Sequence, residues 1–405
     1  MADLPTALVL THEPPLPAVS GTRVRSLNLI RQLADRDWRV SLFTLAAGED
    51  PGPEDRRELE SICARVVVAP FERSRARRLA RIGLGLPRRR AFQESYFHWR
   101  AAARELEPWL AQDGFELILA DQLYMYPYVP ERLRTRTVLD CHNVELRRVE
   151  TMAATLWPKP RGVVARMQRG AVARFEREAV QSVAAVLAVS EPEREYFERL
   201  APGRVSLVPN GVDTSGCAFR DRVSPDPRIL LVGSMDYSAN ADAASYLIRE
   251  ILPGIGTPGA RLTLLGGGVS RSVAREAASA AVPTEAVGRV VSTEPYFERS
   301  RILVVPLRFG GGTRFKILEA LARGLPVLST SMGSEGLGLT HGREIVIADE
   351  PGRFAEWIDR LLEDDGLCES LARNGRRVVE ERYDWRRIGE RLDDALSRVA
   401  GSLGR

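Results

Sequence analysis

Short apolar runs alternate with stretches of helical spacing along almost the whole chain, and this alternation constrains the fold more than any other feature. In the first half, residues 27, 30, 33 and 34 are apolar at helical spacing. Strands separated by helices indicate a parallel sheet covered on both faces. The apolar runs of the first half lie at residues 7–11, 40–45, 66–69, 117–120, 137–139 and 186–189.

The pattern stops at the turn signal Pro209-Asn210-Gly211 and then restarts. A chain of 405 residues is long enough for two domains, which typically have about 100–200 residues each. We therefore predict an α/β protein with Rossmann-like domains over residues 1–212 and 213–383 and an amphipathic helix over 384–405. Ligands of such sheets bind beyond the carboxyl ends of the strands, so we expect a site in the cleft between the domains. The second set of apolar runs lies at residues 229–232, 261–265, 287–291, 302–306, 326–329 and 345–347.

Composition excludes several classes of protein. Apolar residues make up 44% of the chain and charged residues 28%, which is ordinary for a globular protein and wrong for a disordered one. No apolar run approaches the roughly 18 residues of a membrane span. Asp3 and Pro5 stand where a secretory signal would have basic residues. The cysteines (63, 141, 217 and 368) are scattered, which predicts neither disulfides nor a zinc site and favours the cytoplasm.

Residues 56–104 contain 13 arginines and four acidic residues. One interpretation is a solvated helical face. The other is a surface that attracts a phosphorylated or membrane-borne substrate. We expect no nucleic acid partner, because the chain shows no helix-turn-helix pattern, zinc-ligand spacing or RNP-like aromatic residues.

A glycine-rich segment carries one of the chain's two lysines, although 58 residues are basic. After the apolar run at 302–306 come Gly310, Gly311 and Gly312, and a helix is predicted from near Thr313 to Gly324. Arg314 and Lys316 fall in its first turn, where the helix dipole disfavours cations. Consecutive glycines and a helix N-terminus can bind an anion closely. The alternative is a flexible loop with a surface pair of Lys316 and Glu319.

This segment resembles the donor site of family-4 retaining glycosyltransferases, which have the GT-B fold. Other stretches agree with that family in order and spacing, and together they span nearly the whole chain. They are Ser20-Gly21-x-Arg23-x-Arg25, Asp140-x-His142-Asn143-x-Glu145, Val189-Ser190-Glu191, Val208-Pro209-Asn210-Gly211-Val212-Asp213, Val232-Gly233-Ser234-Met235 with Asn240, and Ser331-Met332-Gly333-Ser334-Glu335-Gly336-Leu337.

The resemblance implies two GT-B domains, with the donor nucleotide on the second and the acceptor on the first. It also implies a last helix that returns to the first domain. Glu319 matches the glutamate that hydrogen-bonds the donor ribose. The family's first donor-site glutamate would fall at Gly311, so backbone amides of Gly310, Gly311 and Gly312 or another group must replace its contact with the sugar. The implied donor-binding set is Gly21, Gly233, Ser234, Asn240, Gly310, Gly311, Gly312, Thr313 and Glu319.

Two departures from the family concern the diphosphate. Many members have an arginine and a lysine where this chain has Ser234 and Asn240. We therefore infer that Arg314 and Lys316 bind the diphosphate in their place. The glycines at 266–268 follow another apolar run, and they either contact phosphate or form a simple turn.

On the first domain, His142 resembles the family's histidine beside the donor sugar, which contacts that sugar through its imidazole or the adjacent backbone. We assign it a catalytic role together with Arg314 and Lys316. Arg23, Asp140, Asn143 and Glu145 are candidate acceptor-side residues, and a purely structural role for Asp140 and Glu145 is equally compatible with the sequence. Gly21 is either part of a substrate-facing loop or a turn glycine.

The predicted reaction is transfer of a sugar from a nucleotide-diphosphate donor to an acceptor hydroxyl with retention at the anomeric carbon. We expect no cofactor and no metal, and the one D-x-D tripeptide, Asp35-Arg36-Asp37, falls at the wrong end of the sheet. The acceptor is expected to be phosphorylated, lipid-linked or a natural product, in a bacterial polysaccharide or natural-product pathway. Residues 56–104 would then touch the inner face of the membrane. The alternatives are a non-catalytic nucleotide-sugar-binding subunit and a GT-B epimerase or phosphorylase-like enzyme.

Overall fold

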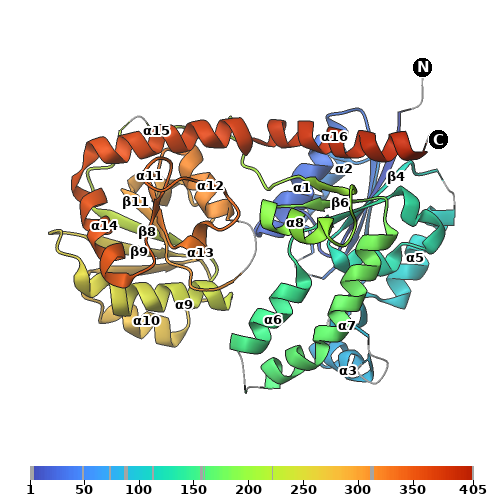
Figure 1. Cartoon of the computed structure of the whole chain (residues 1–405), viewed down its shortest axis with the longest axis horizontal. Coiled ribbons are helices and arrows are strands. Elements are labelled where there is room, and N and C mark those ends of the chain that lie inside the picture. The colour runs from blue at the N-terminus through green and yellow to red at the C-terminus, as the bar shows by residue number, and fades with distance from the viewer. Residues whose placement is uncertain are drawn as a thin grey trace. The chain divides into compact units, whose positions relative to one another are not determined.

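The computed structural model describes residues 4–403 except 48–49, 73, 86–89, 112–113, 156–157, 159, 221 and 311–313. The chain forms two compact units. The first contains the residues up to Asn210 and those from Ile388 onward, and the second contains residues 211–387. Each unit has its own parallel sheet with helices packed around it (Figure 1). The expected α/β fold class is confirmed.

The first unit has a seven-stranded sheet in the order β3-β2-β1-β4-β5-β6-β7, with every pair parallel. Its strands are β1 Thr6–Thr11, β2 Arg39–Leu45, β3 Arg65–Ala69, β4 Leu117–Asp121, β5 Thr137–Cys141, β6 Ala185–Ala188 and β7 Val205–Leu207. The helices are α1 Gly21–Ala34, α2 Pro53–Ile62, α3 Arg75–Gly85, α4 Phe92–Phe97, α5 Arg100–Ala111, η1 Leu123–Tyr128, η2 Glu131–Arg136, α6 Glu145–Thr155, α7 Pro160–Ser182, α8 Glu191–Glu198 and α16 Trp385–Leu403.

The second unit has a six-stranded sheet in the order β10-β9-β8-β11-β12-β13, again parallel throughout. Its strands are β8 Arg228–Val232, β9 Arg261–Leu265, β10 Thr284–Gly288, β11 Ile302–Val305, β12 Val327–Ser329 and β13 Val346–Ile347. The helices are α9 Ser238–Tyr246, η3 Leu247–Ile251, η4 Leu252–Gly254, α10 Arg271–Ala278, α11 Glu294–Arg299, α12 Phe315–Ala322, α13 Ser331–Ser334, α14 Pro351–Glu363 and α15 Asp365–Arg382.

The central strands are buried on both faces, which explains their continuous apolar runs. Leu8 and Leu10 of β1 pack with Phe43 and Ile118 in one core, and Leu230 of β8 is as fully buried in the second unit. This burial fixes the register of the sheet. The side chains after the strand ends therefore come together at one edge.

Two strand predictions were inaccurate. The run at 287–291 was expected to be a strand, but β10 is Thr284–Gly288, because Gly288 has φ +82° and Val291 is fully exposed. The edge strand β7 was not predicted, since three residues are too short to show a period of two.

The last helix packs on α1 within the first unit. A Cβ at Gly389 would meet the side-chain ends of Gln32 of α1 and of Arg36, which follows α1, so the helix lies close to both residues. The guanidinium of Arg36 also forms an ion pair with Asp393. These contacts explain why residues from 388 onward belong to the first unit.

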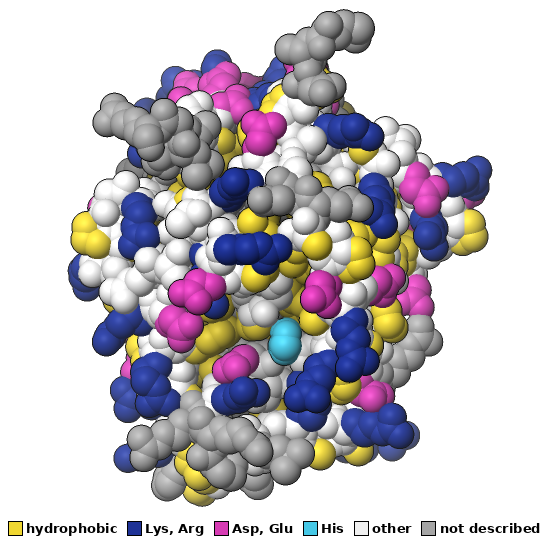
Figure 2. Space-filling view, turned by 90° about the vertical axis from the view of Figure 1, so that its right-hand side faces the viewer, with side chains coloured by type: hydrophobic (Ala, Val, Ile, Leu, Met, Phe, Trp, Pro, Cys, Tyr) yellow, Lys and Arg dark blue, Asp and Glu magenta, His cyan; other side chains and the backbone are white. Residues whose placement is uncertain are grey.

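Many arginines of residues 56–104 have partners inside the unit. Arg56 pairs with Glu60 at 3.1 Å, and Arg77 pairs with Glu72 at 3.3 Å. The guanidinium of Arg65 lies 3.7 Å from the ring centre of Trp109. On the face shown in Figure 2, basic and acidic side chains are interspersed. Among the described helices, none is long and apolar enough to cross a membrane. All four cysteines are buried and free.

Candidate active site

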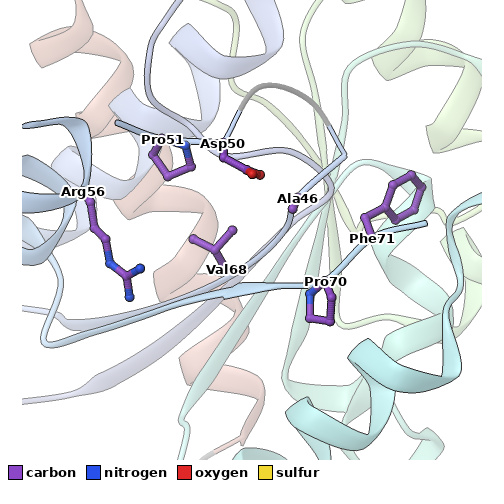
Figure 3. Close-up of a pocket in the computed structure, with 7 residues that line it drawn as sticks. All are labelled: Ala46, Asp50, Pro51, Arg56, Val68, Pro70 and Phe71. Atoms are coloured by element: carbon purple, nitrogen blue, oxygen red, sulfur yellow. The ribbon is translucent and has the colours of Figure 1, made fainter. Parts of the chain in front are cut away.

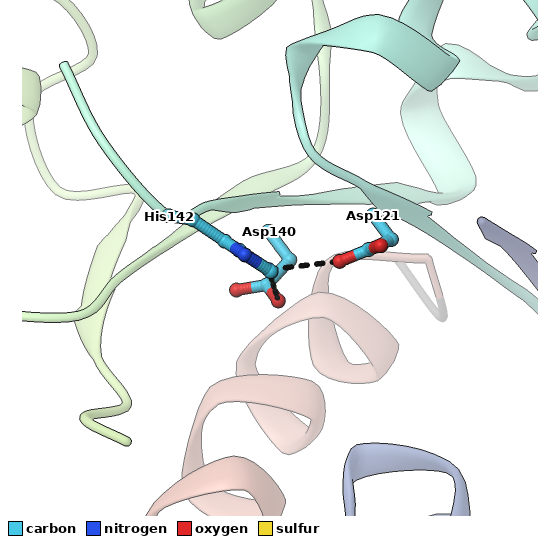
Figure 4. A group of neighbouring side chains, drawn as sticks. All are labelled: Asp121, Asp140 and His142. Carbon is cyan, nitrogen blue, oxygen red and sulfur yellow. Dashed lines mark hydrogen bonds and ion pairs between the residues drawn. The ribbon is translucent and has the colours of Figure 1, made fainter. Parts of the chain in front are cut away.

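A histidine and two aspartates meet at the carboxyl edge of the first sheet (Figure 4). Asp121 ends β4, Asp140 lies in the neighbouring β5, and His142 follows that strand. The Nε2 atom of His142 lies 2.8 Å from Asp121 Oδ1 and 3.0 Å from Asp140 Oδ2. Its Nδ1 atom lies 3.2 Å from the side-chain amide of Gln122. Because both ring nitrogens have neighbours inside the unit, the ring edge and the local backbone remain for a substrate.

Arg25 of α1 completes this cluster. Its guanidinium is fully buried and donates from Nε (2.8 Å) and Nη2 (2.5 Å) to the two carboxylate oxygens of Asp140. Nη1 donates to the Pro209 carbonyl and to Asn210 Oδ1, each at 3.1 Å. The bidentate geometry suits a buried ion pair. Arg25 therefore anchors the end of β5 to α1 and to the end of the first unit.

The charges of this cluster hold one another in their ionised forms. Burial raises the pKa of Asp140, but Arg25 and His142 outweigh it and hold that pKa well below its ordinary value. Burial lowers the pKa of His142, but Asp121 and Asp140 outweigh it and raise that pKa to about 9. Asp140 and His142 thus stabilise each other's ionised forms, next to the guanidinium of Arg25 and the carboxyl group of Asp121.

Ligand atoms of Asp121, Asp140 and His142 lie within 4.8 Å of one another, a spacing that a metal ion could use. However, both oxygens of Asp140 already accept from Arg25, and the pKa of about 9 keeps a proton on His142. A metal would have to displace that proton and compete with the guanidinium. The donor set therefore fits an ion-pair cluster better than a metal centre.

The loop after β1 brings His12 and Glu13 beside this cluster, where Arg23 of α1 contacts Glu13. Arg23 is buried; its Nε donates to Glu13 Oε2 at 3.0 Å and its Nη1 to the Pro17 carbonyl at 3.3 Å. Gly21 is the exposed first residue of α1, after the N-cap Ser20, whose side chain accepts from the Arg23 amide. Arg23 therefore holds the loop, while Gly21 leaves the start of α1 open.

Glu145 begins α6 and is enclosed by the protein. Its carboxylate accepts from Gln93, Tyr124 and Arg148 at 3.0–3.1 Å, and its amide donates to Glu176 at 2.7 Å. Burial raises the pKa of Glu176 to about 7. These contacts favour a structural role for Glu145 over a role in binding the acceptor. Asn143, half-buried, lies in the turn between β5 and α6.

A hollow of about 410 Å³ opens at the carboxyl ends of β2 and β3 (Figure 3). Five of its seven lining residues are apolar, and the other two are an acid and an arginine. It is lined by Ala46, Asp50, Pro51, Arg56, Val68, Pro70 and Phe71.

The carboxyl edge of the second sheet brings a glycine, an asparagine and a lysine together. Gly233 follows β8, and Asn240 lies in α9. Lys316 in the first turn of α12 donates from Nζ to Asn240 Oδ1 at 3.0 Å, and Asn240 donates from Nδ2 to the Ser234 carbonyl at 2.9 Å. A Cβ at Gly233 would lie 2.6 Å from Asn240 and 2.9 Å from Lys316. Glycine at 233 is therefore needed for this arrangement.

Burial and, to a smaller extent, the neighbouring Arg314 together lower the pKa of Lys316 to about 8. Arg314 is buried as well, and its Nη2 donates to the carbonyls of Gly310 (3.2 Å) and Met332 (2.7 Å). Among the described residues, no carboxylate forms an ion pair with Lys316. Arg314 and Lys316 thus lie close together, and no described carboxylate neutralises the charge of Lys316. This arrangement favours the binding of an anionic ligand.

Glu319 points elsewhere than expected. It accepts from Arg323 Nε at 3.3 Å and Thr293 Oγ1 at 3.5 Å, so the alternative of a Lys316–Glu319 surface pair is wrong. Burial raises the pKa of Glu319. Gly310 has φ +112°, and a Cβ there would lie 2.8 Å from the Tyr237 hydroxyl. Gly311, Gly312 and Thr313, assigned to the donor site from the sequence, lie outside the described residues.

The glycines at 266–268 are explained by packing. A Cβ on Gly266 would collide with the Gly233 carbonyl, and one on Gly268 would lie 2.5 Å from Asp236 oxygens. The Met235 amide donates to the Gly267 carbonyl at 2.7 Å. The turn interpretation therefore accounts for them.

The sequence-based site residues thus form two groups, one at each sheet edge. Sequence reasoning missed His12, Asp121 and Gln122. A signal was present, because each lies within three residues of the end of a predicted strand, as His142 does.

Both units of the chain match known protein families. Residues 19–215 match the family described as Glycosyltransferase Family 4, and residues 226–364 match the family described as Glycosyl transferases group 1. The two matches follow one another along the chain and cover both sheets.

Three similar proteins illustrate the match. An uncharacterised 44.6 kDa protein of the cps region of Klebsiella pneumoniae is 25% identical over 40% of this chain, and the chain spans 43% of that protein's length. The 2-deoxystreptamine N-acetyl-D-glucosaminyltransferase of Streptomyces fradiae is 27% identical, with 78% of this chain and 76% of the relative covered. The crystal structure of Anabaena HepE in complex with UDP and glucose has a TM-score of 0.68 at 14% identity, covering 97% of this chain and 99% of HepE. Consecutive family matches over two parallel-sheet units place this chain in the group 1 glycosyltransferases, with the GT-B fold.

Proposed function

We propose that the protein transfers a sugar from a nucleotide-diphosphate donor to an acceptor hydroxyl, with retention at the anomeric carbon. The observation that carries this proposal is the half-buried Lys316 and the position of its ammonium. It lies 3.0 Å from Asn240, against Gly233 at the carboxyl edge of the second sheet, and no described carboxylate pairs with it. A diphosphate would supply the missing negative charge.

In this proposal the second unit binds the donor. Lys316 and Arg314 bind the diphosphate, and Gly233 lets the phosphates approach the backbone closely. Asn240 holds Lys316 in place, and Glu319 accepts hydrogen bonds from the ribose. The backbone amides of residues 310–312 replace the glutamate that is missing at Gly311. The family match and the UDP complex of the structurally similar HepE support a nucleotide donor.

The chemical step needs stabilisation of the leaving diphosphate more than an acid–base pair. The bond from the anomeric carbon to the diphosphate oxygen breaks, and the acceptor oxygen bonds to the same face of the sugar. The acceptor proton passes to the leaving phosphate oxygen. Lys316 and Arg314 stabilise the charge that develops there, because preorganised cations are most effective in a water-poor site. No residue needs to act as a general base, and no metal is required.

The first unit binds the acceptor in this proposal, at the sheet edge that holds His142 and the hollow beyond β2 and β3. His142 contacts the donor sugar through its ring edge or the adjacent backbone. Asp140 and Arg25 position it. Asn143 and Arg23 remain acceptor-side candidates, and Glu145 acts by holding α6 in place. We propose a phosphorylated, lipid-linked or natural-product acceptor and a cytoplasmic location, with residues 56–104 at the membrane surface.

Thermal unfolding with UDP, GDP, ADP or dTDP tests the donor assignment. A ligand at 100 times its dissociation constant adds about 2.7 kcal/mol of stability, and we expect one nucleotide to raise the Tm of the wild type by several degrees. That shift should disappear in Lys316→Ala. The control is Arg353→Ala, which removes an exposed arginine of the second unit. A folded wild type that no nucleotide stabilises would contradict the assignment.

One observation supports a second candidate, a nucleotide-sugar-binding subunit without catalysis. The family's first donor-site glutamate is replaced by Gly311. Incubation of the stabilising nucleotide's sugar conjugate with and without acceptors separates the two. A subunit releases no nucleotide under either condition, whereas an epimerase would consume the donor without an acceptor.

A further inference from the structure

His12 is a buried histidine that the proposed chemistry does not use. It follows β1 directly and is 9% exposed. Its ring meets Phe97 and Tyr124 edge-on, with centroid distances of 5.4 and 5.1 Å. These two aromatic rings fix the plane of the imidazole. The residue therefore presents its nitrogens in defined directions at the sheet edge where we place the acceptor.

Neither nitrogen of His12 makes a hydrogen bond within the described residues. Nδ1 is buried without a partner and lies 3.9 Å from Asp121 Oδ2. Nε2 lies 3.9 Å from Glu13 Oε1. Both gaps exceed a hydrogen-bond distance. A buried polar atom that has no partner is uncommon in folded proteins, and each one calls for an explanation.

The surroundings of His12 determine which nitrogen carries the proton. Burial lowers its pKa and His142 lowers it further, against the opposite effect of Asp121, Glu13 and Glu145. The imidazole is therefore neutral at pH 7, with one protonated nitrogen. Asp121 is nearly fully buried, whereas Glu13 is partly exposed and already accepts from Arg23. Asp121 raises the pKa of His12 more than Glu13 does, so we place the proton on Nδ1, on the side of Asp121, which leaves a lone pair on Nε2.

We propose that His12 is an acceptor-binding residue whose Nε2 accepts a hydrogen bond from a hydroxyl of a polyhydroxy acceptor, such as a sugar, cyclitol or polyol. This inference rests on the proposed function. Because the reacting hydroxyl gives its proton to the leaving phosphate, the hydroxyl at His12 is a second, non-reacting one. His12 thereby orients the acceptor and selects against alcohols with a single hydroxyl.

The test uses the full-length enzyme with the nucleotide sugar identified above, and three acceptors: glycerol, 1-propanol and water. The wild type should transfer to glycerol about tenfold faster than to 1-propanol, as expected for one buried hydrogen bond. His12→Phe should lose that preference but hydrolyse the donor and bind nucleotide as the wild type does. His12→Gln supplies an acceptor oxygen and should recover most of the preference. The control is His98→Gln, a histidine that packs on Tyr128 in the same unit.

Two outcomes would overturn the proposal. In one, His12→Phe still prefers glycerol. In the other, it loses donor hydrolysis and nucleotide binding together with transfer, which would indicate a structural role. A wild type that binds no nucleotide instead defeats the proposed function.

An independent readout needs no turnover. Nitrogen NMR of ¹⁵N-histidine protein, assigned with His12→Gln, should show His12 as the Nδ1–H tautomer. Added glycerol should shift its Nε2 resonance. An Nε2–H tautomer, or an Nε2 resonance that glycerol does not move, would contradict the proposal even if the enzyme is too slow to assay.

Discussion

The two sheet edges use buried charge in opposite ways. In the first unit, Asp121 and Asp140 are matched by Arg25 and His142, so the charges compensate one another inside the protein. In the second unit, Lys316 lies beside Arg314 with only an asparagine as its hydrogen-bond partner among the described residues. The first arrangement is complete without a ligand. The second is not.

This difference distinguishes residues that hold a site in shape from residues that bind. A compensated buried ion pair stabilises the fold only while both partners are present, and removal of one partner is costly. An uncompensated buried cation destabilises the fold and is relieved by an anion. Substitutions at the edge of the first sheet should therefore lower mainly the free energy of unfolding. Substitutions at the edge of the second sheet should lower mainly the affinity for the nucleotide.

The largest effect is expected for Arg25→Met. It leaves the buried carboxylate of Asp140 without its bidentate partner. We expect a loss of about 3–5 kcal/mol in the free energy of unfolding, measured by urea denaturation. The matched control is Arg31→Met, which breaks the exposed pair with Glu58 and should cost less than about 1 kcal/mol. Equal effects of the two substitutions would show that the cluster of the first unit is not a compensated one.

Lys316 should behave in the opposite way. Lys316→Met removes an uncompensated charge, so the free energy of unfolding of the unliganded protein should not fall. Affinity for the nucleotide diphosphate should fall about 30-fold or more, equivalent to about 2 kcal/mol. Isothermal titration calorimetry beside urea denaturation measures both. If Lys316→Met destabilises the unliganded protein but keeps full affinity for the nucleotide diphosphate, Lys316 has a structural role and not a binding one.

The pKa of Lys316 gives this contrast a pH dependence. Its pKa is lowered to about 8 in the free protein, and a bound diphosphate would raise it again. The ammonium is therefore present below pH 8 and lost above it in the free site. Nucleotide affinity should be constant below pH 8 and then fall by up to about tenfold per pH unit. Lys316→Arg, which keeps its charge, should remove this dependence, and an unchanged slope in that variant would exclude Lys316 as its source.

The sequence predicted the parallel sheets because burial on both faces produces apolar runs that need no long-range information. It also predicted Lys316 as a site residue, from its place in the first turn of a glycine-preceded helix, and the family resemblance added Gly233 and Asn240 to the same site. The contact between Lys316 and Asn240 was not predictable, because these residues are 76 positions apart. Helical spacing instead pointed to Glu319, which pairs with Arg323.

The first unit was harder to interpret. Arg25 appeared only as part of a motif, yet its side chain reaches from α1 to the end of β5 and to Asn210. Asp121 and Gln122 follow the same rule as His142, but without a matching motif they were overlooked. Glu145 was assigned to the acceptor because it follows His142 in the chain. The structure instead turns it toward Tyr124 and Arg148.

A smaller effect is expected at Glu319. Glu319→Gln keeps the shape of the side chain but weakens a charge-assisted hydrogen bond to the ribose, so affinity for the nucleotide should fall about tenfold. The same substitution should have little effect on a 2′,3′-dideoxy analogue of that nucleotide, because the ribose hydroxyls are absent. Calorimetric titration with both compounds checks this. An equal loss for both would mean that Glu319 acts by holding Arg323 and not through the ribose.

The smallest effect is expected from metal ions. It tests whether the cluster at the edge of the first sheet needs no ligand. Since Arg25 occupies Asp140 and a proton occupies His142, we expect EDTA to leave sugar transfer and the Tm unchanged, and Mn²⁺ or Zn²⁺ to add no stability at pH 7. Above pH 9 the proton leaves His142, and only there should a metal compete. Arg25→Met serves as the positive control, because it frees Asp140. If a metal stabilised the wild type at pH 7, Asp121, Asp140 and His142 would form a ligand-binding site. Both sheet edges would then need a ligand, and the difference argued between them would be wrong.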